Sequence, residues 1–173
     1  MHVHPQAMYE YAKFSVAMCV YGRDNPEHFR QAIESIIDQS IRPGEIVLVV
    51  DGPIPTTVED IVASYGGLDF FKVVRLAENV GHGNARRIAL ENCMHELVAI
   101  VDADDINVPD RFVAQLRCFC EDSALSIVGG NIEEFMGTPG TPINVVSVRD
   151  VPGSNRDRRD NSHPDTDMGF GET

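Results

Sequence analysis

The stretch LVAIVDADDINVPDRF (residues 97–112) joins five apolar residues to three closely spaced carboxylates, Asp102, Asp104 and Asp105. A short run that is apolar on both faces is typical of a parallel strand covered by helices on both sides. Pro109 then favours the start of a helix. The stretch therefore predicts a buried strand, an acidic loop at its carboxyl end and a helix, which together form one unit of an α/β fold.

The same alternation runs through the chain before this stretch. Apolar runs predict strands at residues 14–20, 46–50 and 70–76, and helical spacing of apolar residues predicts helices at 27–39 and 56–67. The segment 78–95 opens with glycines and then becomes helical. Either Thr56 or Thr57 is expected to cap the second helix. Further strands are predicted at 125–135 and 143–148. Strands that alternate with helices indicate an α/β, Rossmann-like, mostly parallel sheet flanked by helices. Such sheets bind ligands beyond the carboxyl ends of their strands, so we expect the site there.

Composition limits the classes of function. The chain has 173 residues, enough for one domain with a tail, and 43% of them are apolar, which supplies a sizeable core. Its net charge of −13 argues against a nucleic-acid partner, because phosphate binding needs a basic surface. The four cysteines lack the paired spacing of a zinc site and are expected to be free thiols.

The two ends of the chain differ from its middle. Residues 1–13 contain no apolar segment of signal-peptide length, and no run approaches the ~20 apolar residues of a membrane helix. Residues 151–173 are rich in Asp, Arg, Asn, Gly and Pro, which predicts disorder. We therefore expect an N-terminal extension (1–13), a folded domain (14–150) and a disordered tail (151–173) in a cytoplasmic protein.

The acidic loop after residues 97–101 predicts a metal site. Alternate residues of a strand-end loop, here Asp102 and Asp104, are expected to face one cavity. Carboxylate oxygens suit Mg²⁺ or Mn²⁺, which often share their coordination with substrate phosphates. A bound cation would also remove the repulsion that raises carboxylate pKa values. The alternative is a solvated acidic turn in which Asp105 or Asn107 caps the following helix.

Two other strand ends carry candidate binding residues. The carboxylate of Asp51 ends the second predicted strand and is placed to accept hydrogen bonds from a base or a ribose, although the sequence DGP also suits a simple turn. In NVGHGNARR (residues 79–87), glycines allow a tight turn or a close approach to a ligand. Arg86 and Arg87 follow one turn into a helix, where an anionic group would be favoured. The alternative is a tight connection with solvated arginines.

A dinucleotide-binding fingerprint is the main rival interpretation. Gly81 and Gly83 follow a strand, and Asp102 lies near the end of the next one. Arg86 occupies the position of the third glycine, however, where its side chain would crowd the contact between helix and strand. A dinucleotide site also needs one acidic residue rather than three. This alternative, and a nucleotidyltransferase on a related fold, therefore rank lower.

These motifs in this order resemble the family 2 glycosyltransferases, which have the GT-A fold. The resemblance covers about residues 14–151 and rests on five segments together: SVAMCVYGRDNPEHFRQAIESIIDQS, EIVLVVDGP, ENVGHGNARRIAL, VDADDINVPDRF and IVGGNIEEF. It implies a transferase that moves a sugar from a nucleotide-sugar donor to an acceptor hydroxyl. The family's catalytic base lies in an acceptor-binding half further along the chain. We therefore expect a truncated form of the fold, its donor-binding portion, with the catalytic residue unassigned.

The resemblance also implies roles for individual residues. Arg86 matches the basic residue near the base and phosphate, and the D-x-D pair matches Asp102 and Asp104. Asp104 is implied as the ligand of Mn²⁺ or Mg²⁺ on the diphosphate, with Asp102 as a second ligand or a contact to the ribose or sugar, and Asp105 assisting. The nucleotide-sugar-binding residues that the resemblance implies are Cys19, Tyr21, Asp51, Gly81, Arg86, Asp102, Ala103 and Asp104.

The resemblance further implies a setting for the reaction. The partners would be a nucleotide sugar, with a UDP-sugar favoured, and a glycan or lipid-linked acceptor used in cell-surface polysaccharide synthesis. Transfer would be metal-dependent and inverting. Association with the inner face of the membrane and a homo-oligomer held together by exposed apolar surface are further expectations. The alternative is an inactive nucleotide-sugar-binding module that lacks its catalytic base.

Overall fold

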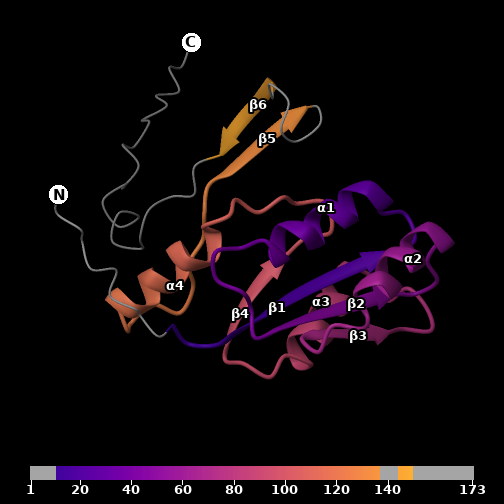
Figure 1. The fold of residues 1–173 in the computed structure, drawn as a ribbon, viewed down its shortest axis with the longest axis horizontal. Coiled ribbons are helices and arrows are strands. Elements are labelled where there is room, and N and C mark those ends of the chain that lie inside the picture. Colours follow the sequence, from indigo (N-terminus) through magenta and orange to yellow (C-terminus); the bar gives the residue numbers. More distant parts are fainter. Residues whose placement is uncertain (1–10, 137–143, 150–173) are drawn as a thin grey trace, which may run out of the picture. The chain divides into compact units, whose positions relative to one another are not determined.

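Strands and helices alternate along the chain in the computed structural model, which describes residues 11–136 and 144–149. Two compact units divide at Val128 and Gly129. The first unit contains β1 (Phe14–Tyr21), α1 (Pro26–Ile37), β2 (Glu45–Asp51), α2 (Thr56–Tyr65), β3 (Phe71–Arg75), α3 (His82–Glu91), β4 (Leu97–Val101) and α4 (Arg111–Glu121) (Figure 1). The second contains an antiparallel pair, β5 (Ile132–Met136) and β6 (Asn144–Arg149).

The sheet of the first unit has the strand order β3-β2-β1-β4, and every neighbouring pair is parallel. The carboxyl ends of all strands therefore lie at one edge. Strand order reverses direction between β1 and β4, which makes this the switch point where sheets of this type bind ligands. The register pairs Met18 with Val101, so β1 continues past the end of β4. The loop that follows β4 consequently begins beside the last residues of β1.

The two faces of the sheet have separate cores, because side chains alternate along each strand. One face carries Val16, Met18 and Val20 of β1 and packs with buried residues of α1, α2 and α4. The other face carries Ala17 and Val49 and packs with Ala85 and Ala89 of α3. Figure 1 shows α1 and α2 on one side of the strands and α3 on the other. The predicted α/β class with helices flanking a parallel sheet is confirmed.

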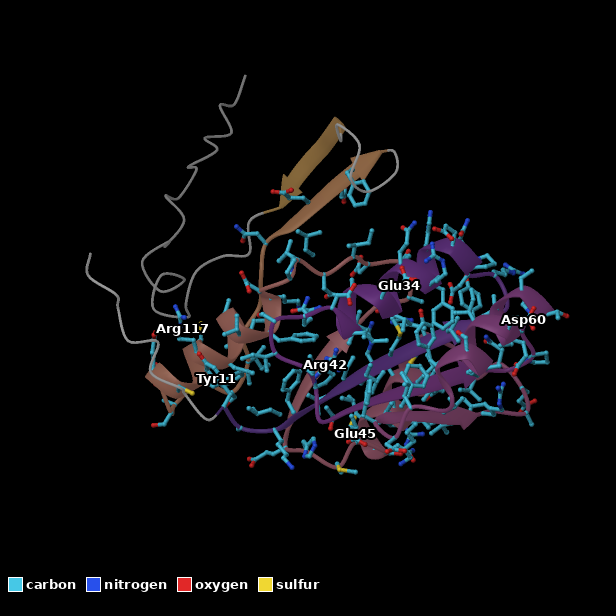
Figure 2. The ribbon with its side chains drawn as sticks, in the orientation of Figure 1. Tyr11, Glu34, Arg42, Glu45, Asp60 and Arg117 are labelled. Atoms are coloured by element: carbon cyan, nitrogen blue, oxygen red, sulfur yellow. The ribbon has the colours of Figure 1, made fainter. Side chains whose placement is uncertain are left out.

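A buried polar group fixes the amino edge of the sheet. The carboxylate of Glu45, at the start of β2 (Figure 2), accepts hydrogen bonds from the hydroxyl of Ser15 at 2.6 Å and from the backbone N–H of Met94 at 2.5 Å. The Ser15 hydroxyl in turn accepts the backbone N–H of His95 at 3.2 Å. These bonds hold the connection between α3 and β4, and they satisfy a carboxylate that is only 4% exposed.

The structure corrects several local predictions. Within the described part of the chain β4 is an edge strand, and Ile100 is 41% exposed, so the expectation of a strand buried on both faces was wrong. Helix α2 has Pro55 at its N-cap with no side-chain cap, so neither Thr56 nor Thr57 has that role. Helix α4 begins at Arg111 rather than Pro109.

The remaining predictions concern the last strands and the two ends of the chain. The strand expected at residues 125–135 is confined to β5, because residues 125–131 are irregular. The strand expected at 143–148 corresponds to β6. The predicted tail (151–173) and most of the predicted extension (1–13) lie outside the described residues, and the domain boundaries stay predictions. In the parts of the chain that are described, no helix is both long and apolar enough to cross a membrane.

Candidate functional site

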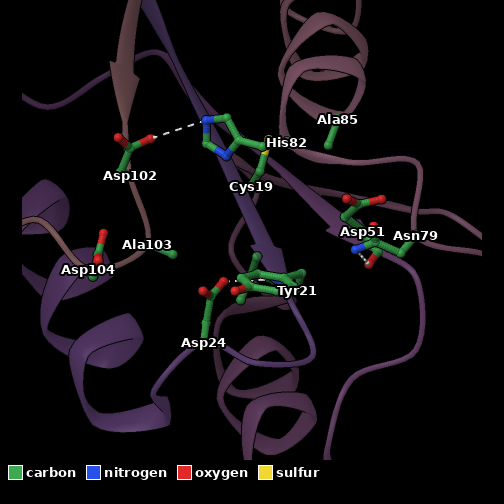
Figure 3. Close-up of a pocket in the computed structure, with 11 residues that line it drawn as sticks. Cys19, Tyr21, Asp24, Asp51, Asn79, His82, Ala85, Asp102, Ala103 and Asp104 are labelled. Carbon is green, nitrogen blue, oxygen red and sulfur yellow. Dashed lines mark hydrogen bonds and ion pairs between the residues drawn. The ribbon is translucent and has the colours of Figure 1, made fainter.

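A cavity of about 380 Å³ opens at the carboxyl ends of β1, β2 and β4, at the switch point of the sheet (Figure 3). Its walls come from the ends of these strands, the loop after β3 and the first turn of α3. The lining residues are Cys19, Val20, Tyr21, Asp24, Asp51, Asn79, His82, Ala85, Asp102, Ala103 and Asp104. Four of these side chains are carboxylates, so the cavity carries a concentrated negative charge.

Asp51 braces one wall of the cavity. Its carboxylate, in a residue only 4% exposed, accepts the backbone N–H groups of Val80 at 2.8 Å and Gly81 at 3.1 Å. The side-chain amide of Asn79 donates to the backbone carbonyl of Asp51 at 3.2 Å (Figure 3). Carboxylate oxygens have further lone pairs, so Asp51 retains capacity to accept a hydrogen bond from a ligand in the cavity.

Gly52 makes this bracing sterically feasible. Its φ is +82°, which L side chains rarely adopt, and a Cβ there would lie 2.6 Å from the backbone nitrogen of Asn79. The loops after β2 and β3 therefore touch backbone to backbone. Gly81, which precedes α3, also has a positive φ of +85°, but a Cβ there would meet nothing within 4 Å. Gly52 thus allows the loops after β2 and β3 to approach closely, whereas Gly81 allows the turn before α3.

Arg86 reaches from α3 to the loop after β4 and forms an ion pair with Asp102. His82, at the first position of α3, places Nε2 at 4.0 Å from Oδ1 of the same carboxylate (Figure 3). By contrast, the carboxylate of Asp104 makes no hydrogen bond or ion pair with any residue that the structure describes. One acid of the pair is therefore paired within the chain, while the other has no such partner among the described residues.

The pKa values of two further acids, Asp24 and Asp105, are raised in this region. Burial raises the pKa of Asp24 above its ordinary value, and the carboxylates of Asp104 and Asp102 raise it further, although the backbone N–H of Tyr21 that Asp24 accepts at 2.9 Å opposes them. Burial also raises the pKa of Asp105, followed by the charges of Asp102 and Asp104. A cation placed among these groups would lower both pKa values.

Cys19 lies in the cavity wall as a protonated thiol at neutral pH. Burial raises its pKa from 9.0 to about 11, the Arg86 charge opposes this, and the carboxylates of Asp51 and Asp102 add to it. A thiol of this kind is a weak nucleophile. Cys19 therefore contributes shape and a small apolar surface to the site.

The structure brings the predicted site residues together. Six of the eight line the cavity: Cys19, Tyr21, Asp51, Asp102, Ala103 and Asp104. The other two adjoin it, since Gly81 donates its N–H to Asp51 and Arg86 pairs with Asp102. Asp102 and Asp104 flank Ala103, which is 7% exposed and packs into the core. Asp102 and Asp104 thus line one cavity, as the sequence suggested. The ligand that each residue would bind stays a prediction.

Five cavity residues are not among the eight predicted binding residues: Val20, Asp24, Asn79, His82 and Ala85. Asp24 lies three residues beyond the last residue of β1, so a search of the segments that follow the strands could have found it. His82 is the first residue of α3. Asn107 was considered as a helix cap, but α4 begins four residues later and the N-cap is Asp110, which makes no side-chain cap.

The donor set at Asp102 and Asp104 fits a divalent cation that shares its coordination with a ligand. Among the described residues no group of three or more His, Cys, Asp or Glu side chains could hold a metal ion. Mg²⁺-type sites commonly use one or two carboxylates together with substrate phosphates. A hard cation bound here would therefore need further ligands besides these two carboxylates.

Comparison with known proteins places these features in a family. The model of the family described as glycosyl transferase family 2 matches residues 15–169. An uncharacterized glycosyltransferase of Haemophilus influenzae is 40% identical over 82% of this chain and 52% of its own length. The amylovoran biosynthesis glycosyltransferase AmsE of Erwinia amylovora is 34% identical over 70% of this chain and 46% of its own length.

A third relative and a solved structure agree with this assignment. The UDP-Gal:alpha-D-GlcNAc-diphosphoundecaprenol beta-1,3-galactosyltransferase of Escherichia coli is 33% identical over 74% of this chain and 46% of its own length. The crystal structure of S. aureus TarS superposes with a TM-score of 0.55 and 26% identity, covering 63% of this chain and 20% of TarS. The chain thus spans about half the length of the curated relatives it matches. With the family match covering most of its residues, this chain belongs to glycosyltransferase family 2.

Proposed function

We propose that this chain supplies the donor-binding part of a metal-dependent glycosyltransferase that acts in cell-surface polysaccharide synthesis. One observation carries the proposal: Asp102, paired with Arg86, and Asp104, without a partner among the described residues, line one cavity at the switch point of the sheet. Relatives named for amylovoran and teichuronic acid biosynthesis support the biological setting. The E. coli relative, named for UDP-Gal and a diphosphoundecaprenol acceptor, supports a UDP-sugar donor and a lipid-linked acceptor.

The charge of the cavity explains why a cation is part of the proposal. Asp24, Asp51, Asp102 and Asp104 would repel a diphosphate, and Arg86 already neutralises one of these acids. Mn²⁺ or Mg²⁺ held by Asp104 and Asp102 would supply the positive charge that a leaving diphosphate needs. Asp51 and Tyr21 would contact the base, and Arg86 would hold Asp102 in place.

The proposed reaction breaks the bond between the anomeric carbon and the phosphate oxygen of the donor and forms a bond from that carbon to the acceptor oxygen. The acceptor's proton passes to a base, and attack from the opposite face inverts the anomeric centre. In this proposal the cavity residues contact the donor, and none of the described residues is assigned as the base. What this chain's residues contribute is orientation of the nucleotide and charge balance around the diphosphate.

Calorimetric titration of UDP tests the proposal. We expect binding that requires Mn²⁺ and is lost in Asp104→Ala. Asp69→Ala is the matched control, because Asp69 is exposed at the amino end of β3 and its loss changes the net charge equally. Metal-independent binding, or equal loss in both variants, would overturn the proposal. Release of UDP from a UDP-sugar, measured in parallel, separates a transferase from a module that only binds.

A further inference from the structure

The loop that carries Asp102 and Asp104 is hydrogen-bonded to the C-terminal end of α1. This acidic loop (residues 102–110) connects β4 with α4 and contains no helix or strand. Its first part is fixed at the sheet, because Asp102 pairs with Arg86 and Ala103 is buried in the core. Its second part contacts Ser35 in the last turn of α1 and Gln39 just after that helix.

Ser35 uses every hydrogen bond that its hydroxyl can make. The hydroxyl donates to the backbone carbonyl of Ala32 at 2.7 Å. It accepts the backbone N–H of Asn107 at 3.1 Å and the side-chain amide of Asn107 at 2.9 Å. The remaining side-chain oxygen of Asn107 accepts a hydrogen bond from Arg111. Since Asn107 is only 7% exposed, these partners replace water for a buried amide.

Gln39 holds the next residues in the same way. Its side-chain amide, in a residue 5% exposed, donates to the carbonyls of Ser35 at 3.0 Å and Val108 at 2.7 Å. Its side-chain oxygen accepts the backbone N–H of Phe112 at 3.2 Å, in the first turn of α4. The backbone N–H of Ser40 also donates to the carbonyl of Pro109 at 2.9 Å. Ser35 and Gln39, here called the α1 anchor, therefore fix the loop from Asn107 to the start of α4.

The conformations open to the acidic residues of the loop are limited by two fixed residues, Ala103 in the core and Asn107 bonded to Ser35. Only Asp104, Asp105 and Ile106 lie between Ala103 in the core and Asn107 on the anchor. A hydrogen bond from the N–H of Asp105 to the carbonyl of Asp102 at 3.3 Å further closes this turn. With both ends of so short a segment held, the direction of the Asp104 carboxylate depends on where α1 places Asn107.

We propose that Ser35 and Gln39 are positioning residues for the site. They touch neither the cavity nor, on the proposed function, the cation and nucleotide, and they act by setting the conformation of the acidic loop. Supporting partners of metal ligands typically change metal affinity by about 10–100-fold when they are removed. The α1 anchor affects metal affinity indirectly, because it holds Asn107 and so sets the conformation of the loop that carries Asp104. The metal-dependent part of this inference rests on the proposed function, whereas the control of the loop does not.

Two serines that hold distant backbone N–H groups make a matched test. Ser35→Ala removes the half-buried hydroxyl that holds Asn107. Ser15→Ala removes a buried hydroxyl that also holds a backbone N–H, that of His95, but at the amino edge of the sheet. Ser35→Thr restores a hydroxyl at position 35. Hydrogen exchange of the full chain, resolved over residues 102–109, is measured for each variant, together with UDP affinity with and without Mn²⁺.

We expect Ser35→Ala to speed exchange across residues 102–109 and to weaken Mn²⁺-dependent UDP binding about tenfold. Ser15→Ala should leave both unchanged, and Ser35→Thr should recover most of the wild-type values. Asn107→Ala, made from the loop side, should reproduce the effect if Ser35→Ala proves too unstable to study. In the double variant that combines Ser35→Ala with Asn107→Ala, the two losses of UDP affinity should not add, because both substitutions remove the same interaction between Ser35 and Asn107.

Two results would overturn the inference: exchange in the acidic loop that is no faster in Ser35→Ala than in Ser15→Ala, or faster exchange with unchanged UDP affinity. Absence of Mn²⁺-dependent UDP binding in the wild-type chain would instead reject the proposed function. In that case the exchange comparison still decides whether α1 controls the loop.

Discussion

Arg86 of α3 forms an ion pair with Asp102, the residue that follows β4, and so links two segments on either side of the switch point. Because of this pair, the two neighbouring acids Asp102 and Asp104 have different surroundings. Asp102 is held within the chain, whereas Asp104, two residues later, is left unpaired among the described residues. The predictions below follow from this arrangement and from the loops around it.

Arg86→Ala should weaken Mn²⁺-dependent UDP binding by about 10–100-fold, because it removes a positive charge from an acidic cavity and leaves Asp102 without its partner. Arg87→Ala is the control on the same helix, since Arg87 pairs with Glu91 at 2.5 Å on an exposed surface. Calorimetry should show the control within about twofold of wild type. Tighter binding in Arg86→Ala would mean instead that the pair withholds Asp102 from the cation.

Asp51→Asn should lower the free energy of unfolding by about 1–3 kcal/mol, because the amide can no longer accept both N–H groups that the carboxylate accepts. The N–H groups of Val80 and Gly81 should then exchange faster with solvent. Asp60→Asn, on the exposed surface of α2, provides a control that should change stability by less than about 0.5 kcal/mol. Urea unfolding measures both. Equal stability of the two variants would show that Asp51 does not brace the loop.

Gly52→Ala should destabilise the chain by at least about 2 kcal/mol, since it combines a left-handed backbone with a close contact to the backbone of Asn79. Gly67→Ala is the matched substitution, because a Cβ there meets nothing within 4 Å and its φ is not positive. It should be neutral or slightly stabilising. Thermal unfolding distinguishes the two, and a neutral Gly52→Ala would contradict the close approach of the loops.

Cys19 should react slowly with iodoacetamide at pH 8. Its pKa of about 11 gives a thiolate fraction roughly 100-fold smaller than that of a thiol at 9.0. The exposed Cys120 serves as the internal reference, and mass spectrometry of the digested protein reports both sites. Alkylation of Cys19 as fast as Cys120 would contradict the raised pKa.

The same pKa predicts how stability depends on alkaline pH. A thiol whose pKa is raised in the folded state favours folding below its ordinary pKa, and this contribution is lost as pH rises through the folded value. Stability should therefore fall between about pH 9 and pH 11 as the unfolded thiol ionises first. Cys19→Ser should reduce this loss, and identical pH profiles for the two proteins would count against it.

Local patterns predicted much of the fold. The strand at residues 97–101 and a helix within residues 78–95 were predicted from the spacing of apolar residues, and both are present, as β4 and α3. The burial of β4 was predicted wrongly, because an apolar run does not reveal whether a strand has one neighbour or two. The start of α4 was placed two residues early, because Pro109 is compatible with a first helical turn but is here held by Ser40 instead.

The sequence by itself determined that acids and glycines follow the strands, because strand ends and turns are encoded by neighbouring residues. It also predicted that Asp102 and Asp104 would face one cavity, since the chain alternates around Ala103. Only the tertiary structure decided which groups these residues meet. Asp51 bonds Val80 and Gly81 across 29 and 30 positions, and Ser35 holds Asn107 across 72. Such contacts depend on strand order and register, which bring distant segments together and which no local pattern specifies.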